Sequence, residues 1–339
     1  MPHNPQAIVF LGDTRDLHHH GCEAVVAEIL QGMSDAGIPP TAVLAGLNWK
    51  PDERLCLDAA LVIVNGEGAL HHSRPLVPLI LELAEKRREH NRPTALINSS
   101  WFSNSAELTS RLIAFDFICA RDPQSAREIA THSPTPMLVP DQAIAYAARH
   151  LPPSPPSPDG RLMVGDSTIP RLTRDLRGLA ARRGWDYLPV LARPTTPRPG
   201  KKSRKIQKHY RLARRLGPLA RWLLSPRHHA HLVGEVDTGK YLQRISNCQG
   251  VVTGRFHTVC MAIGLQSPFL AVGSNTPKIE ALLIDAGLDP VKRMVPADKL
   301  AEITDVPPFS PEELEAVKTY AQRVREQSSL LYNRLSGMI

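Results

Sequence analysis

The sequence predicts an α/β protein made of two doubly wound domains that face each other across a cleft. Short apolar runs, typical of buried strands, alternate with helical patterns along the chain. The length of 339 residues favours two domains over one. Between the halves lies "LPPSPPSPDG", residues 151–160, whose five prolines predict a stiff, extended linker. Strands that alternate with helices imply parallel sheets with right-handed connections.

The N-terminal domain is expected to span residues 1–150. Glycine closes its first predicted helix, and proline occupies the first turn of its last one, as is common at helix ends. In order, the pattern predicts the strand "AIVFLGD", the helix "CEAVVAEILQGMSDAG", the strand and glycine loop "DAALVIVNGEGAL", the strands "RPTALINSS" and "FDFICARD", the helix "PQSAREIA" and the closing segment "TPMLVPDQA".

The C-terminal domain is expected to span residues 161–310. The last pattern, residues 311–339, is one long helix that we expect to pack back toward the N-terminal domain. In order, the domain contains the strand "RLMVGDST", a helix near 171–183, the strand "DYLPVL", a basic insertion at 193–232, a helix at 238–248, the β-α-β unit "VVTGRFHTVCMAIGLQSPFLAVG" and the segment "TPKIEALLIDAGL".

The five cysteines are scattered along the chain without C-x-x-C spacing. Reduced thiols and a cytoplasmic location are therefore expected. No apolar run approaches the roughly 18 to 20 residues that a membrane-spanning helix needs.

The positive charge of the chain is concentrated in the basic insertion. Twelve of the 41 Lys and Arg residues lie there, and the remaining chain holds 29 basic against 33 acidic residues. Four leucines, at 212, 216, 219 and 223, form a helical stripe among these arginines. Such a stripe in 201–227 can lie on an anionic membrane surface at the inner face of the membrane. The other interpretation is a solvated insertion whose leucines pack on the core. No nucleic-acid partner is expected.

Arg255 and His257 stand at the predicted start of the helix in the β-α-β unit, directly after Gly254. Unpaired backbone N–H groups and the positive end of the helix dipole favour an anion there. Two cationic side chains would strengthen that preference, and glycine allows a ligand to approach the backbone. The other interpretation is an arginine paired with a neighbouring carboxylate and a histidine that caps a loop carbonyl.

A second strand delivers a cation to the same predicted edge. In "VGSNTPKIEAL" a strand is followed by the polar residues Ser274 and Asn275, by Pro277 in a first helical turn, and by Lys278. Two helix starts with cationic side chains at one sheet edge predict a phosphorylated ligand, which can carry a second acidic group.

The chain resembles the polysaccharide pyruvyl transferase family. The resemblance rests on "GCEAVVAEI", "NGEGAL", "ARDPQSAREI" with "VPDQA", "TGRFHTVCMAIGLQSPFLAV" and "KIEALLIDAGL", taken in this order. It implies two Rossmann-like domains of the B-type glycosyltransferase (GT-B) fold. It also implies a transferase that moves pyruvate from phosphoenolpyruvate to a sugar of a cell-surface or exopolysaccharide glycan, free or lipid-linked, as a ketal. No cofactor is expected beyond this donor substrate.

The resemblance assigns donor binding and proton transfer to Arg255 and His257. A sugar hydroxyl adds to C2 of the enol while C3 takes a proton, which a histidine can supply. A second hydroxyl then displaces phosphate, and the planar fork of Arg255 suits that leaving group. The predicted donor-binding residues are Gly254, Arg255, His257, Ser274, Asn275 and Lys278.

The loops of the N-terminal domain are expected to hold the acceptor. The family usually has three glycines where this chain has Gly66, Glu67 and Gly68. Asp13, Glu23 and Glu67 are candidate bases for the acceptor hydroxyl, with Asp13 and Glu67 kept as catalytic candidates. The predicted acceptor-binding residues are His20, Glu23, Glu67 and His71. No metal site is expected, because the adjacent histidines of these loops point in different directions.

Two other functions remain open at this point. One is a glycosyltransferase of the same fold that uses a nucleotide-activated sugar, for example a CMP-linked acidic one, since its phosphates would use the same helix starts. The other is a glycan-binding protein without catalytic activity. Nucleotide binding distinguishes the first, and absence of turnover distinguishes the second.

Overall fold

The computed structural model describes residues 7–17, 19–133, 135–152, 161–191, 237–273 and 277–339. Most of the predicted linker and the predicted basic insertion, with its membrane-facing stripe, lie outside these residues. Ser274 and Asn275 lie outside them as well, so their predicted donor contacts stay predictions.

The N-terminal domain contains a six-stranded parallel sheet in the order β2-β1-β3-β4-β5-β6. Its central strands contain apolar runs, residues 8–11 of β1, 61–64 of β3 and 95–97 of β4, because helices cover both faces. Alternate residues of β1 enter two different cores, Phe10 in one and Val9 in the other. The strands are β1 (Ile8–Asp13), β2 (Ala42–Ala45), β3 (Leu61–His71), β4 (Thr94–Phe102), β5 (Phe117–Ala120) and β6 (Met137–Leu138).

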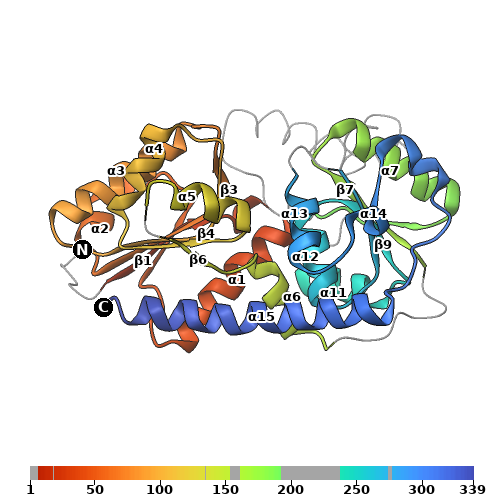
Figure 1. The fold of residues 1–339 in the computed structure, drawn as a ribbon. Coiled ribbons are helices and arrows are strands. Elements are labelled where there is room, and N and C mark those ends of the chain that lie inside the picture. Colours follow the sequence, from red (N-terminus) through yellow and green to blue (C-terminus); the bar gives the residue numbers. More distant parts are fainter. Residues whose placement is uncertain (1–6, 18, 134, 153–160, 192–236, 274–276) are drawn as a thin grey trace, which may run out of the picture.

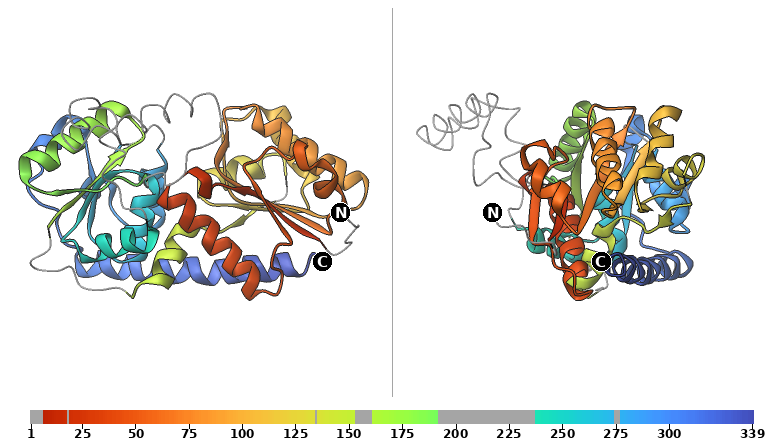
Figure 2. Two further views of the ribbon diagram at one scale, coloured as in Figure 1. Left: turned by 180° about the vertical axis from the view of Figure 1, so that it is seen from behind. Right: turned by 90° about the vertical axis from the view of Figure 1, so that its left-hand side faces the viewer.

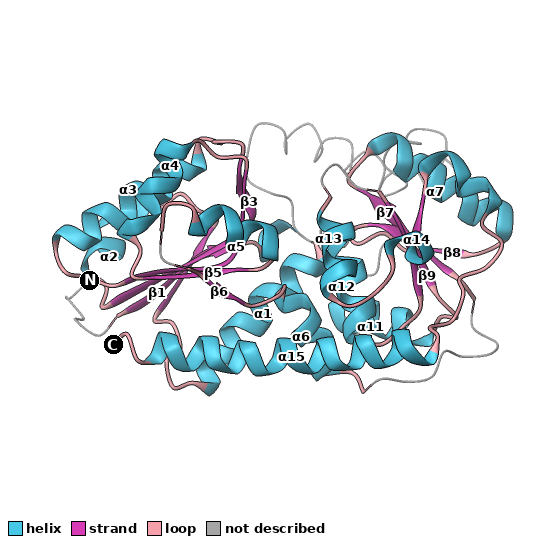
Figure 3. Cartoon of the chain, in the orientation of Figure 1, coloured by secondary structure: helices cyan, strands magenta, loops and turns pink. Residues whose placement is uncertain are grey.

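Helices α1 and α6 lie on one face of this sheet, and α2, α3, α4 and α5 lie on the other (Figure 3). Their side chains form the two cores that the central strands separate. The helices are α1 (His20–Asp35), α2 (Glu53–Asp58), α3 (Leu76–Glu89), α4 (Ala106–Ser110), α5 (Pro123–Ala130) and α6 (Gln142–His150).

The C-terminal domain contains a five-stranded parallel sheet in the order β11-β10-β9-β7-β8. Two parallel-sheet domains, as the sequence predicts, are therefore confirmed. Its strands are β7 (Met163–Ser167), β8 (Asp186–Tyr187), β9 (Val251–Gly254), β10 (Phe269–Val272) and β11 (Met294–Val295). Its helices are α7 (Pro170–Arg183), α11 (Thr238–Asn247), α12 (Phe256–Gly264), α13 (Lys278–Asp285) and α14 (Pro290–Arg293).

One hydrophobic core is shared by the two domains. It combines side chains of α1 and α6 from the first domain with those of α11 and α12 from the second. Helix α15 (Pro311–Ser336) runs beneath both domains and adds Val317 near its start and Tyr332 near its end to the same core (Figures 1 and 2). The Tyr332 hydroxyl donates to Gln142 of α6 at 2.9 Å, which ties the end of α15 to the N-terminal domain.

Strand β3 is longer than the sequence predicts. The segment 66–68, predicted as a loop, belongs to the strand, which continues pairing with β4 as far as His71 and Phe102. The register shifts between Glu67 and Leu70, so the segment forms an irregularity within the ladder. Such an irregularity bends a strand without ending it. The glycines at 66 and 68 are typical of loops as well as of irregular strands, so the sequence alone predicted a loop.

Candidate active site

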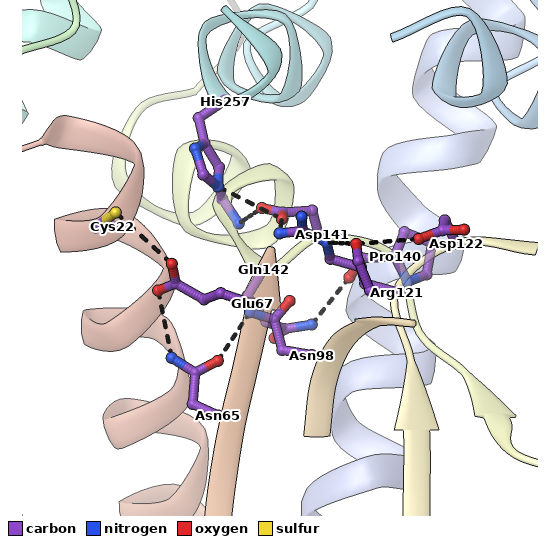
Figure 4. A network of polar contacts seen from close by, with 12 residues as sticks. Cys22, Asn65, Glu67, Asn98, Arg121, Asp122, Pro140, Asp141, Gln142 and His257 are labelled. Carbon is purple, nitrogen blue, oxygen red and sulfur yellow. Dashed lines mark hydrogen bonds and ion pairs between the residues drawn. The ribbon is translucent and has the colours of Figure 1, made fainter. Parts of the chain in front are cut away.

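The carboxyl ends of strands from both sheets meet where the two domains face each other. Arg121 directly follows β5, and Asp141 comes three residues after β6, both in the N-terminal domain. Arg255 and His257 follow β9 of the C-terminal domain. Figure 4 shows His257 above Asp141 and Arg121, with Glu67 and Cys22 beside them. In open α/β sheets this edge is where ligands bind.

Arg255 is held by a buried carboxylate. Its Nε and Nη2 atoms lie 2.8 and 2.5 Å from Oδ2 of Asp166, a residue of β7 that is 3% exposed. Its backbone N–H donates to the Thr253 hydroxyl at 3.1 Å. The pairing with a neighbouring carboxylate, one of the two interpretations of the sequence, is thus present. A donor contact by Arg255 stays a prediction, and it would use the part of the guanidinium that Asp166 does not occupy.

His257 lies in the first turn of α12 and faces both domains. Its Nε2 atom is buried and lies 3.6 Å from Oδ2 of Asp141. The other side of the ring packs on Gly21 at the start of α1, where an added Cβ would overlap Cβ, Cγ and Nδ1 of His257. A larger residue at position 21 would therefore collide with the imidazole of His257.

Asp141 is a buried carboxylate surrounded by donors. It caps α6 by accepting the Ala143 N–H at 3.0 Å, and its Oδ2 lies 3.0 Å from Nη1 of Arg121. Burial alone would raise its pKa, but the charge of His257, whose Nε2 lies 3.6 Å away, and then the charge of Arg121 hold the pKa well below its usual range. Asp141 therefore carries a negative charge at neutral pH.

Two further cations flank the ring of Phe256. The guanidinium carbon of Arg121 lies 5.2 Å from the ring centroid, and Nζ of Lys278 lies 5.4 Å from it. Burial, and next the positive charge of Arg121, lower the pKa of Lys278 to about 8. Within the described ranges Lys278 forms no ion pair. Arg121 and Lys278 repel each other in this partly buried site, and an anionic ligand would relieve that repulsion.

Glu67 is buried in an unusual backbone conformation. Its φ of 40° lies in the left-handed region, which costs a residue with a side chain about 1 to 2 kcal/mol. The carboxylate accepts hydrogen bonds from the Thr14 hydroxyl at 2.5 Å and the Asn65 amide at 3.3 Å, and Cys22 Sγ lies 3.7 Å away. A Cβ at the neighbouring Gly68 would lie 2.9 Å from Nη2 of Arg121, so a side chain there would push against the guanidinium. Strain kept at such a place suggests a function.

The other predicted residues of the N-terminal domain lie in different surroundings. Asp13 forms a two-pronged ion pair with Arg15, and although burial acts to raise its pKa, the hydrogen bonds and charge of Arg15 lower it overall. Glu23 lies half-buried in the first turn of α1. His71 lies half-buried at the end of β3, where burial and then the charges of Arg74, His72 and Lys278 lower its pKa.

His20 does not join this group. It is 1% exposed, its Nδ1 lies 2.8 Å from the Thr238 hydroxyl, and its ring stacks on Tyr241 at 4.3 Å. These contacts direct the side chain toward α11 rather than toward Glu67. In this structure His20 joins α1 to the C-terminal domain, so its prediction as an acceptor-binding residue is not favoured.

Sequence reasoning missed three residues of this site, Arg121, Asp141 and Asp166. Arg121 and Asp141 belong to the quoted motifs "ARDPQSAREI" and "VPDQA", so their position after strands could have identified them. Asp166 is the last residue but one of β7, in "VGD", and nothing in the sequence pairs it with Arg255. His19 caps α1, since its Nδ1 accepts the N–H of Gly21 at 3.0 Å.

As the N-cap of α1, His19 accepts a hydrogen bond at Nδ1, so this nitrogen carries no proton and the ring is uncharged. Burial, and next the positive charges of His257, Arg255 and His20, lower the pKa of His19 well below its usual range. Its ring lies 5.3 Å from that of His257 in an edge-on arrangement. The two histidines therefore differ in role, because His19 holds the start of α1 while His257 faces the cation group.

The described residues show no sign of a metal site or of a membrane span. They contain no cluster of three or more His, Cys, Asp or Glu side chains arranged to hold a metal ion. The part of the chain that the structure describes also contains no helix with the length and apolar character of a membrane span.

Two doubly wound domains with a cationic site between their sheet edges define a protein of the GT-B class. The fold is similar to that of a putative UDP-N-acetylglucosamine 2-epimerase from Listeria monocytogenes, with a TM-score of 0.51 and 11% identity. The match covers 98% of this chain and 95% of that one. A UDP-GlcNAc 2-epimerase from Methanocaldococcus jannaschii is 9% identical, with a TM-score of 0.49 over 93% of this chain and 98% of that one. At such identity the likeness to the first concerns the fold alone.

The sequence pattern of polysaccharide pyruvyl transferases matches residues 12–276. The chain belongs to the polysaccharide pyruvyl transferase family and is a transferase. A comparison with curated proteins yields no match. The matched range includes Glu67, Arg121, Asp141, Arg255 and His257.

Proposed function

We propose that the protein transfers pyruvate from phosphoenolpyruvate to two hydroxyls of a sugar in a cell-surface or exopolysaccharide glycan, which forms a ketal. The observation that carries this proposal is the pair of cations, Arg121 and Lys278, that flanks Phe256 beside His257. Family membership supports the same reaction class.

The cation group suits the donor. Phosphoenolpyruvate carries a phosphate and a carboxylate on adjacent atoms, so it needs two cationic sites close together. Lys278 suits the phosphate as a point charge, and the Nη2 group of Arg121, which neither Asp141 nor Ser100 occupies, can donate to the carboxylate. Arg255 is fixed by Asp166, and a rigid guanidinium pays less entropy for each further contact.

The acid and the base come from opposite domains. His257 is the titratable group of the α12 start and is placed to protonate C3 of the enol. Glu67 is the better candidate base for the acceptor hydroxyl, because the carboxylate of Asp13 is occupied by Arg15. His257 gives one proton to C3 while Glu67 takes one from the first hydroxyl, and exchange with water restores both groups. The proton of the second hydroxyl leaves with the phosphate.

The proposal is tested by ligand-dependent melting followed by turnover. Phosphoenolpyruvate, CMP and UDP are added separately, and a ligand at about 100 times its Kd should stabilise the protein by about 2.7 kcal/mol. A shift with phosphoenolpyruvate alone, followed by phosphate release when a glycan acceptor is added, is expected. A shift with a nucleotide alone would favour a glycosyltransferase, and binding without turnover would favour a glycan-binding protein.

Donor binding should weaken above neutral pH because of Lys278. Its pKa is about 8, so the ammonium is charged below that pH and loses its charge as the pH rises through it. Between pH 7 and 9 the donor phosphate stays dianionic, and affinity for phosphoenolpyruvate should fall about tenfold. Calorimetry at both pH values measures this.

The matched control is Lys278→Arg, which stays charged throughout this range and should flatten the pH dependence of donor affinity. Lys278→Gln should bind phosphoenolpyruvate about tenfold more weakly at pH 7, since a hydrogen bond to a charged group is lost. A wild-type affinity that does not change from pH 7 to 9 would remove Lys278 from the donor site.

A further inference from the structure

We infer that Asp141 of the N-terminal domain positions His257 of the C-terminal domain by accepting its Nε2–H, so that Nδ1 is the nitrogen that delivers the proton. The part that concerns proton delivery rests on the proposed function. The part that concerns positioning is independent of any substrate.

The two ring nitrogens of His257 have different surroundings. Nε2 is buried, has no hydrogen-bond partner within 3.5 Å among the described residues, and faces Asp141 Oδ2 at 3.6 Å (Figure 4). Nδ1 lies on the side of the ring that packs on Gly21. A distance slightly beyond hydrogen-bond range is common in unliganded catalytic sites and shortens when the substrate binds.

Asp141 is anchored without the help of His257. Its Oδ1 accepts the Ala143 N–H, and its Oδ2 faces Arg121 Nη1, whose Nε in turn donates to the Ser100 hydroxyl at 2.6 Å. The carboxylate is 1% exposed. A fixed, buried negative charge in front of Nε2 favours a proton on that nitrogen in the neutral ring and stabilises the imidazolium.

The proton transfer then has a defined start and end. The imidazolium gives its Nδ1 proton to C3 of the enol while the acceptor oxygen bonds to C2 and the base takes the hydroxyl proton. The ring that remains carries its proton on Nε2, where Asp141 accepts it. Beside the ring, the Asp141 carboxylate lies 3.6 Å from Nε2 and the His19 ring lies 5.3 Å away, and Asp141 is the only carboxylate among the described residues that forms an ion pair with His257.

The substitution Asp141→Asn tests the inference, because asparagine also caps helices well. If its amide oxygen keeps the Ala143 N–H, its NH₂ group takes the place of Oδ2 and faces Nε2 as a donor. The neutral His257 ring should then carry its proton on Nδ1 instead of Nε2. The matched control is Asp289→Asn, which makes the same change at the cap of α14, where Asp289 accepts the Val291 N–H at 2.9 Å.

The measurement is ¹⁵N NMR of the histidine rings in the full chain without ligand, with His257 assigned by its absence in His257→Asn. In the wild type and in Asp289→Asn the neutral ring should be the Nε2–H form. In Asp141→Asn it should become the Nδ1–H form. Turnover should fall about 10²-fold or more with the donor KM within a few fold.

An Nδ1–H ring in the wild type, or the same tautomer in wild type and folded Asp141→Asn, would overturn the inference. The wild-type tautomer decides the question even if the variant does not fold. A changed tautomer together with no phosphoenolpyruvate turnover in the wild type would leave the positioning in place and overturn the proposed function instead.

Discussion

His257→Asn is expected to lower turnover at saturating substrate by about 10²-fold or more while donor affinity changes only a few fold. Asparagine keeps a polar side chain at the start of α12 and can still donate a hydrogen bond, but it cannot give up a proton. The loss should therefore appear in kcat rather than in KM. Single-turnover kinetics with phosphoenolpyruvate and a glycan acceptor measure it.

The pH dependence separates an acid from an anion contact. A histidine acid makes kcat fall as the pH rises and the imidazolium loses its proton, and His257→Asn should lose this limb. The pKa of Lys278 is about 8, so its own loss of charge also contributes to the alkaline limb, and both profiles are therefore compared in the Lys278→Arg background. Near-normal turnover and an unchanged alkaline limb in the variant would leave His257 as an anion contact only.

Glu67→Gln is expected to lower kcat by about 10² to 10⁴ as well, because the amide cannot accept the acceptor hydroxyl proton. The amide oxygen can still accept from Thr14 and Asn65, so the fold around the strained residue should be kept. Asp13→Asn is the matched control. Its carboxylate pairs with Arg15, and the substitution should change kcat little.

The outcome that counts against Glu67 is a large loss in Asp13→Asn with a small one in Glu67→Gln, since this would move the base to the loop after β1. The melting temperature of each variant shows whether a loss of turnover comes from unfolding. Because neither substitution touches Arg121, Lys278 or His257, donor affinity serves as the internal check and should stay within a few fold in both.

The local elements were predictable from the sequence, and the contacts between distant segments were not. Apolar runs and helix-start residues identified β9 and α12, and with them the place of Arg255 and His257. The partner of Arg255 is Asp166, which lies 89 residues earlier, and no local pattern connects the two. Glu67 was placed in a loop, because the pairing that keeps it in β3 comes from a neighbouring strand and not from its own sequence.

The contact between Asp141 and His257 is the clearest case of this limit. Each residue stands at a recognisable sheet edge, but they belong to different domains, and their proximity depends on how α6 packs against α12. That packing is set by the buried side chains of a shared core, whose members alternate between the two halves of the chain. A domain-by-domain interpretation of the sequence assigned donor and acceptor to separate domains, whereas Arg121 of the first domain joins the cations of the second.

The shared core and the course of α15 limit how freely this enzyme can be recombined. In a modular two-domain transferase, one domain could be exchanged for that of a relative to obtain a new acceptor preference. Here α1, α6 and α15 present apolar side chains to α11 and α12 across the domain boundary, so an exchanged domain would meet a surface that it has not been matched to. A chimaera should therefore keep these five helices as one unit and graft only the loops at the carboxyl ends of β1 and β3, where the N-terminal domain can vary without disturbing the common core.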